Sequence, residues 1–426
     1  MALLFVGHDP GAINHVRPLL ERAEAAGRPC RLVELRDPGA PWPGDEAAAL
    51  RRAEGALAAA VRDLLPGAWP ALAVCGISTN RAEQDFVRAC RRRLRVQTAV
   101  LIDFAPGHRL GAARPGDAGF PDFLWTTNPR ARADLLERYG LSPDRVVMVG
   151  STFLGKLAAE AGSPVQFTRA EVLKHYYLHG AIMKNGTSVP MVSSKCPIVP
   201  YFLSPDDMVP DAAAAIPRCL ELFVQDFDRY VAFFEERNYQ RLPGSTECCI
   251  EWIVVFRPHP RNEAGTIDAV QEAVDGLGRM ERIGEHSLRY LYLDRGEGRK
   301  IDNKSLVRAS IATVTMGSTL SVESLCWGVP SAFFKRGWDD TRIEQIMGGL
   351  PVERLNTPEE THDFLEAAAS RLVPEANSEP VNVEHCLGAV DRAWQWLEGR
   401  LPGRLPAGSR TGGGGGAAPA AKRARR

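Results

Sequence analysis

The sequence lacks an excess of charge of either sign. Its 426 residues include 52 basic and 52 acidic side chains, so the formal net charge is zero. A chain without net charge does not present the broad electrostatic attraction on which binding to nucleic acid or to an anionic membrane depends. We therefore expect no nucleic-acid partner.

Long apolar runs and paired cysteines are also missing. No stretch approaches the roughly 20 apolar residues that a membrane-spanning helix needs, and the first six residues are too short, and lack the basic leader, for a signal peptide. The nine cysteines form no Cys-x-x-Cys pair, and their odd number argues against a complete disulfide framework. We expect a cytoplasmic protein without a transmembrane segment, a metal site or a cofactor; peripheral contact with a membrane is left open.

The first half of the chain alternates short apolar runs with helical patterns. The predicted strands are 3–6, 31–35, 71–75, 96–102, 123–126 and 146–149. The predicted helices between them are 14–26, 45–65, 81–94 and 129–139. Strands that alternate with helices in this way indicate a doubly wound parallel sheet.

The same alternation begins again in the second half. Its predicted strands are 198–203, 249–256, 289–293, 311–316 and 331–334, and its predicted helices are 212–238, 264–277, 319–327, 358–372 and 384–397. A chain of this length exceeds what one hydrophobic core usually organises. We therefore predict an α/β protein of two tandem Rossmann-like parallel-sheet domains that face each other across a cleft.

The predicted domains have definite boundaries. Residues 1–150 form the first domain, 151–197 an interdomain connection with an insertion, and 198–372 the second domain. Residues 373–401 hold a C-terminal helix that we expect to pack back on the first domain. Residues 402–426 consist of Gly, Ala, Pro and Arg without apolar periodicity, which is typical of a disordered tail.

A Gly-Ser-Thr turn in the second half is the first candidate site. The apolar run 311–316 leads into Gly317, Ser318 and Thr319, and a helical pattern follows. Glycine frees the backbone there, and Ser318 is a suitable helix N-cap. The N–H groups and partial positive charge of a helix N-terminus favour a phosphate. The turn predicts a phosphate site, or a capped helix of no special function. Glu323, five residues after Ser318, is a candidate ligand for ribose hydroxyls or a carboxylate that favours the helix dipole.

A second candidate follows the strand 249–256. There Arg257 and Arg261 flank His259, which lies between two prolines. Stiff backbone and basic side chains suit a phosphate-bearing leaving group, and His259 is placed to stabilise the charge that develops on it.

The third candidate follows the first strand. Gly7 and Gly11 permit a close backbone turn, and His8, Asp9 and His15 all lie within that loop and the start of the next helix. A histidine or an aspartate there is suited to remove a proton from a hydroxyl. Helix capping by Asp9 and simple surface exposure of the histidines are the alternatives.

Ser78, Thr79, Asn80 and Asp103 follow the next strands of the first half and are candidates to line the same crevice, or turn and capping residues.

The combination of these motifs resembles the GT-B superfamily of nucleotide-sugar glycosyltransferases and the related UDP-N-acetylglucosamine 2-epimerases. The stretch 11–18, Gly-Ala-Ile-Asn-His-Val-Arg-Pro, is similar to the Gly-Gly-His-x-x-Pro loop of MurG-like transferases, with Ile13-Asn14 in place of part of the glycine run. The His259-Pro260 dipeptide with the Ser/Thr-rich turn resembles bacterial polysialyltransferases, capsular Kdo transferases and glycerol-phosphate polymerases. The likeness covers about residues 1–340 in architecture.

The resemblance implies a metal-independent glycosyltransferase of polysaccharide, glycoconjugate or natural-product biosynthesis. Its second domain holds a UDP-, CDP- or CMP-linked donor, with Ser318 and Thr319 on the phosphates, His259 on the leaving group and Glu323 on the ribose. Its first domain presents a hydroxyl acceptor, a glycan or a small molecule, with His8, Asp9 or His15 as base. Epimerisation or hydrolysis of a nucleotide sugar, and nucleotide-sugar binding without catalysis, are the alternatives; the chain is a monomer or a homodimer.

Overall fold

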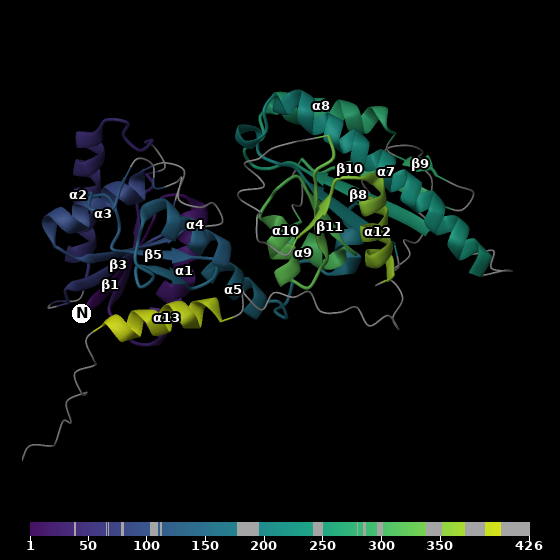
Figure 1. Ribbon diagram of the computed structural model, residues 1–426. Coiled ribbons are helices and arrows are strands. Elements are labelled where there is room, and N and C mark those ends of the chain that lie inside the picture. The colour runs from purple at the N-terminus through teal and green to yellow at the C-terminus, as the bar shows by residue number, and fades with distance from the viewer. Residues whose placement is uncertain are drawn as a thin grey trace, which may run out of the picture.

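The computed structural model describes most of the chain. The described residues are 1–37, 40–64, 66, 68–77, 81–102, 110, 113–176, 196–241, 250–278, 280–283, 287–295, 301–337, 352–370 and 388–401. The predicted tail 402–426, much of the predicted insertion and the candidates Ser78, Thr79, Asn80 and Asp103 lie outside these residues. Two lobes, each a sheet covered by helices, lie side by side (Figure 1).

The first lobe contains a six-stranded sheet in which every pair of neighbours is parallel. Its order is β2-β1-β3-β4-β5-β6. The strands are β1 (Ala2–Gly7), β2 (Cys30–Glu34), β3 (Pro70–Cys75), β4 (Gln97–Ile102), β5 (Phe123–Thr126) and β6 (Val146–Met148). The helices are α1 (Pro10–Ala25), α2 (Glu46–Arg62), α3 (Ala82–Arg93) and α4 (Pro129–Tyr139). The sequence places all of these elements to within a few residues.

Alternate residues of the central strands pack on opposite faces of this sheet. Leu4 and Val6 of β1 join the core formed with α2 and α3, while Leu3 and Phe5 join the core formed with α1 and the C-terminal helix α13 (Ala389–Arg400). Side chains of a strand alternate between faces, so a strand covered on both sides is apolar throughout. This accounts for the uninterrupted apolar run that begins the sequence.

The second lobe contains a seven-stranded sheet of order β13-β12-β11-β7-β8-β10-β9. The strands are β7 (Ile198–Phe202), β8 (Ile250–Arg257), β9 (Met280–Arg282), β10 (Ser287–Leu293), β11 (Thr313–Thr315), β12 (Ser331–Phe334) and β13 (Glu353–Leu355). The helices are α7 (Ala212–Arg241), α8 (Ala264–Gly276), α9 (Asn303–Ala309), α10 (Leu320–Cys326) and α12 (Pro358–Ala369), with a short 3-10 turn at Asp206–Met208. The edge strand β9 pairs antiparallel with β10; the short strands β9 and β13 and the helix α9 are absent from the sequence prediction.

The segment after the first sheet joins the lobes. Helix α5 (Thr152–Ala159) contacts both α1 and α10. Residues 169–176 are helical, and Phe167 and Tyr176 pack with Ile198 and Ile253 in the core of the second sheet. Residues 167–176 of the predicted connection are therefore built into the second lobe, while α5 contacts both lobes.

Helix α13 returns to the first lobe and lies along it (Figure 1). Its Trp394 and Leu397 pack in the core beside α1, and the Arg392 side chain donates to the carbonyl of Val149 at 3.1 Å. Among the described residues, none of the helices combines the length and the apolar character needed to cross a bilayer.

Candidate functional site

The strand order of the second sheet opens a crevice at one point. Strand β7, the first strand of this sheet in the sequence, lies between β8 and β11. The strand order therefore reverses at β7, because β8, β9 and β10 lie on one side of it and β11, β12 and β13 on the other. Ligands of doubly wound sheets bind at such a point, beyond the carboxyl ends of the strands. A cavity of about 560 Å³ lies there. Its lining includes Leu203, Arg257, His259, Asp294 and Ser318, which follow or end four different strands.

His259 is held in one orientation and one tautomer. Its ring Nδ1 accepts the backbone N–H of Arg261 at 3.1 Å, and its own backbone N–H donates to Asn262 Oδ1 at 2.6 Å. Burial, followed by the charge of Arg261, lowers the pKa of His259 to about 4, against the opposite effect of two nearby aspartates. A neutral imidazole that accepts at Nδ1 carries its proton on Nε2. His259 therefore supplies an N–H donor at neutral pH.

Asp206 fixes the loop that carries His259. Its carboxylate accepts from the Asn262 side chain at 2.6 Å, from the backbone N–H of Glu263 at 2.8 Å and from the hydroxyl of Thr266 at 2.9 Å. The loop after β7 and the loop after β8 are thereby tied together. Asp206 therefore has a structural role in this turn.

Arg257 is buried and its charge is already paired. Its guanidinium forms an ion pair with Asp294, and it donates to Asn303 Oδ1 at 2.7 Å, to the Tyr176 hydroxyl at 2.9 Å and to the Ile301 carbonyl at 2.8 Å. The sequence motif suggests a phosphate ligand. The contacts instead describe an arginine that organises the floor of the cavity, because most of its five N–H donors have protein partners.

The Gly-Ser-Thr turn lies at the end of β11. Gly317 has a positive φ of 90°, which glycine adopts without strain. Ser318 lines the cavity, and its hydroxyl accepts the backbone N–H of Leu320 at 3.3 Å. Thr319 immediately precedes α10, already has helical dihedral angles and makes no side-chain capping bond; the hydroxyl that accepts from the start of the helix belongs to Ser318, the residue that the sequence suggests as N-cap.

Thr319 and Glu323 lie one turn apart at the start of α10. The Thr319 hydroxyl is 3.3 Å from Glu323 Oε1. Burial raises the pKa of Glu323 to about 7, although part of the side chain remains accessible, while the bond from Thr319 and the charge of His15 act to lower it. His15 belongs to α1, so the pair spans the two lobes.

His15 occupies the joint between the lobes. It is 5% exposed, its ring lies 6.0 Å from that of Phe153 at 70°, and its carbonyl accepts a bond from the Thr152 hydroxyl. Both partners belong to α5. His15 is thus close enough for its charge to affect Glu323, although the resemblance assigns the two residues to opposite substrates.

In the first sheet β1, the first strand in sequence, lies between β2 and β3 and pairs in parallel with both, so the strand order reverses there. Gly7 ends β1 and Gly76 follows β3, and a Cβ on Gly76 would lie 2.5 Å from the carbonyl oxygen of Ala12. Asp9 caps α1 by accepting the Ala12 N–H at 2.7 Å. His8 is half-buried and donates its backbone N–H to Glu83 Oε1 at 2.8 Å. Of the three candidate bases, Asp9 has a capping role and His15 an interdomain one.

The pKa of His8 is lowered from its ordinary value. Burial is the main cause; Asp9 opposes it, and Arg52 and Arg36 add to it. His8 is therefore neutral at pH 7, the state in which an imidazole accepts a proton.

Several residues around the cavity and around His8 could not be identified from the sequence. Asp294 and Asn303 follow strand β10, and Tyr176, Glu83 and Trp42 come from distant segments. Among them, only Asp294 has a recognisable sequence signal, because it is a carboxylate directly after an apolar strand.

Within the described ranges, no group of three or more His, Cys, Asp or Glu side chains is arranged to hold a metal ion.

Comparison with known proteins identifies the architecture. No family model matches the chain, and a search of curated proteins found no match. Solved structures do match. UDP-GlcNAc 2-epimerase from Methanocaldococcus jannaschii superposes with a TM-score of 0.56 at 11% identity, over 93% of this chain and 99% of that one. The chain has the GT-B fold.

Two further structures are similar over the same extent. The UDP-GlcNAc 2-epimerase from Neisseria meningitidis, bound to UDP-GlcNAc, gives a TM-score of 0.54 at 12% identity over 94% of this chain and 99% of that chain. S. aureus MnaA in a co-structure with UDP gives a TM-score of 0.54 at 11% identity, over 93% of this chain and 96% of that chain. The predicted fold class is confirmed: two Rossmann-like domains of GT-B type.

Proposed function

We propose that the protein is a glycosyltransferase that moves a sugar from a nucleotide-activated donor to an acceptor hydroxyl. The observation that carries this proposal is the cavity at the carboxyl ends of β7, β8, β10 and β11. The neutral imidazole of His259, which offers an N–H donor, and the hydroxyl of Ser318 both line this cavity of about 560 Å³. Small-molecule and cofactor sites fall in the range of roughly 300–1,000 Å³.

The second lobe supplies the donor site in this proposal. Ser318 and Thr319, at the start of α10, contact the phosphates, and His259 donates through Nε2 to the phosphate oxygen on which charge develops as the glycosidic bond breaks. Glu323 accepts from the ribose hydroxyls. Arg257 does not contact the phosphate; it holds Asp294 and Asn303 in place on the cavity floor.

The first lobe supplies the acceptor site. Among the three candidates His8 suits the role of base, since it is neutral at pH 7 and part of it is accessible at the end of β1. Positioning of both substrates, removal of the acceptor proton and stabilisation of the leaving phosphate together provide the catalysis.

Nucleotide-sugar epimerisation is the second candidate, because the solved structures that match include several UDP-GlcNAc 2-epimerases. The two activities differ in their need for an acceptor. Incubation of the protein with UDP-GlcNAc alone leaves the sugar unchanged if the enzyme is a transferase; its conversion without an acceptor supports the epimerase.

The test of the donor site is a calorimetric screen of UDP, CDP, CMP, GDP and dTDP. A hydrogen bond to a charged group contributes about 1.5–3 kcal/mol, so His259→Ala is expected to weaken the preferred nucleotide roughly 10- to 150-fold. His362→Ala is the matched control, since His362 packs on Tyr230 and Phe233, away from the cavity lining. The donor site is refuted if none of these nucleotides binds at millimolar concentration, or if both variants bind as the wild type does.

A further inference from the structure

Trp42 stands against the His8 ring. It comes from the segment between β2 and α2, and the two ring centroids are 5.7 Å apart at an angle of 85°. The Arg52 guanidinium lies over the indole, 5.1 Å from its centroid, and also donates to the carbonyl of Pro41 at 3.0 Å. The indole is thus packed between α2 and the end of β1.

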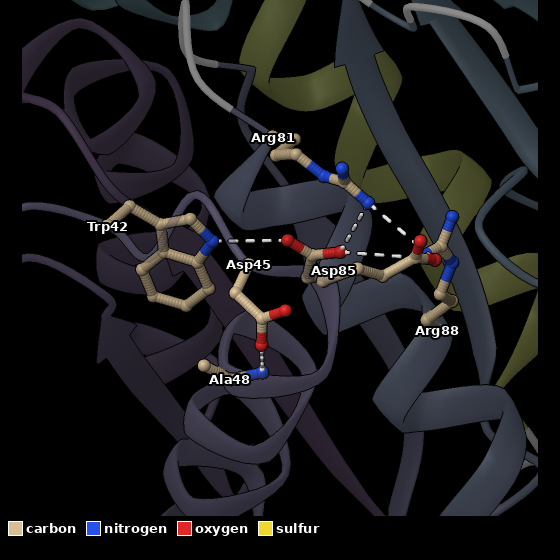
Figure 2. Close-up of polar contacts among 7 residues, drawn as sticks. Trp42, Asp45, Ala48, Arg81, Asp85 and Arg88 are labelled. Carbon is tan, nitrogen blue, oxygen red and sulfur yellow. Dashed lines mark hydrogen bonds and ion pairs between the residues drawn. The ribbon is translucent and has the colours of Figure 1, made fainter.

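A buried carboxylate anchors the indole. Trp42 Nε1 donates to Asp85 Oδ2 at 3.1 Å, and Asp85 is fully buried in the first turns of α3. Its other oxygen faces Arg81 at 3.4 Å and Arg88 at 3.6 Å. Figure 2 shows the indole N–H directed at this carboxylate, with the two guanidinium groups on its far side.

The same network is closed by Glu46 of α2. Its carboxylate lies 2.5 Å from Arg88 and 3.9 Å from Arg81. Two carboxylates and two arginines therefore satisfy one another and tie α2 to α3. A buried charge is costly unless it is paired and hydrogen-bonded; here the pairing also fixes the oxygen that receives Trp42.

A second carboxylate of α3 holds the backbone of the same histidine. Glu83, two residues before Asp85, is 2% exposed and accepts the His8 N–H at 2.8 Å. Trp42 therefore restricts the position of the His8 ring, and Glu83 restricts the position of the His8 main chain. Both restraints originate in the first turn of one helix, which starts at the carboxyl end of β3.

We propose that Trp42, anchored by Asp85, and Glu83 are positioning residues that fix His8 at the carboxyl end of β1. This inference rests on the proposed function for the role of His8 as base. A base must lie within hydrogen-bond reach of the proton it removes, and misplacement by about 1 Å costs on the order of 100-fold in rate. The buried carboxylate of Asp85, paired with the partly exposed guanidinium groups of Arg81 and Arg88, thus holds the indole that contacts this one side chain.

The charges that face His8 come from four elements. Asp9 follows it in the chain, Arg36 comes from the segment after β2, Arg52 from α2 and Glu83 from α3. Since Trp42 covers part of the imidazole, removal of the indole exposes the ring to water. The pKa of His8 is then expected to rise toward its ordinary value of 6.5.

NMR titration of the His8 ring tests this in the full-length protein. Trp42→Leu removes the indole and is expected to raise the pKa of His8 toward its ordinary value, because burial is the main cause of the lowered pKa. Asp85→Asn keeps the indole and weakens its anchor, so the indole N–H resonance of Trp42 is expected to move upfield. Loss of the Asp85 charge acts directly to lower the pKa of His8, so a rise in this variant reports loosening of Trp42.

Asp45→Asn is the matched control. Asp45 lies near Trp42 in Figure 2, but its carboxylate caps α2 by accepting the Ala48 N–H at 2.7 Å, and asparagine caps as well as aspartate. The His8 and Trp42 signals are expected to stay unchanged in this variant. The inference is overturned if Trp42→Leu leaves the pKa of His8 unchanged or lowers it, or if Asp85→Asn leaves the indole resonance in place.

The design separates this inference from the proposed function. Nucleotide binding takes place in the second lobe, so all three variants are expected to bind the preferred nucleotide with wild-type affinity, which also shows that they are folded. If the wild type binds no nucleotide, the proposed function fails while the NMR result still decides the placement of His8. Should Trp42→Leu fail to fold, the indole resonance in Asp85→Asn decides the question.

Discussion

Arg257 offers a sharp test of how the donor cavity is built. Arg257→Met keeps much of the side-chain volume and removes the cation, which leaves the Asp294 carboxylate buried with the Tyr176 hydroxyl as a partner at 2.8 Å. The two side chains are 8% and 5% exposed, so the Asp294 carboxylate is left largely desolvated without its cation. Removal of one member of a buried ion pair costs about 3–5 kcal/mol. For a domain of this size, that corresponds to a fall in melting temperature of roughly 6–20 °C.

Two further variants calibrate the measurement. Tyr176→Phe removes a hydroxyl that donates to Asp294 and accepts from Arg257 while leaving the ion pair intact, so its expected cost is about 1–2 kcal/mol. Arg295→Met is the matched control. Arg295 also lines the cavity, but its bridge to Asp268 is largely exposed, and such a pair contributes about 0–1 kcal/mol.

Scanning calorimetry of the unfolding of the second lobe is the assay, combined with nucleotide titration of each variant. A structural Arg257 predicts a large loss of stability. The reasoning is refuted if Arg257→Met melts within about 2 °C of the wild type and loses nucleotide affinity instead, because that result makes Arg257 a phosphate ligand.

Three other substitutions test the interdomain joint and the close approach of Gly76 to α1. The native pKa of Glu323 is about 7 against an ordinary 4.5, so the folded state binds the extra proton and loses stability as the pH rises from 4.5 through 7. As the pH rises from 4 to 8, the free energy of unfolding of Glu323→Gln is therefore expected to increase by about 1–3 kcal/mol relative to that of the wild type. Urea unfolding at a series of pH values measures this difference, and a difference that does not change with pH contradicts it. Gly76→Ala is expected to cost about 1–3 kcal/mol, because its Cβ would lie 2.5 Å from the Ala12 carbonyl oxygen. Gly55→Ala, in open space on α2, is expected to stabilise by about 0.5–1 kcal/mol, and similar melting temperatures for the two variants would show that the close approach is not strained.

The elements of the fold were largely predictable, because each strand and helix follows from a local pattern. The uninterrupted apolar run of β1 and the apolar stretch before Gly317 indicate strands buried on both faces. The edge strand β9 was not predictable. It is three residues long and pairs antiparallel with β10, and such a short element has no periodicity of its own.

The candidate site was predictable only as a set of strand ends. The loop after β8 and the turn after β11 both reach the cavity through His259 and Ser318, which agrees with the expectation that they converge. The roles within the set were not predictable. Arg257 reads as a free cation in the sequence, and its partner Asp294 lies 37 residues away.

The sequence by itself determined the two α/β units, the glycine turns and the chemical types of residue at the strand ends. These depend on interactions between neighbours in the chain, which a local pattern records. Only the tertiary structure decided that the charge of His15 acts on Glu323 across the joint, and that Trp42 and Glu83 converge on His8. Contacts of this kind depend on strand order and on the packing of helices far apart in sequence, so the charge, burial and protonation of a side chain are set only when the chain has folded.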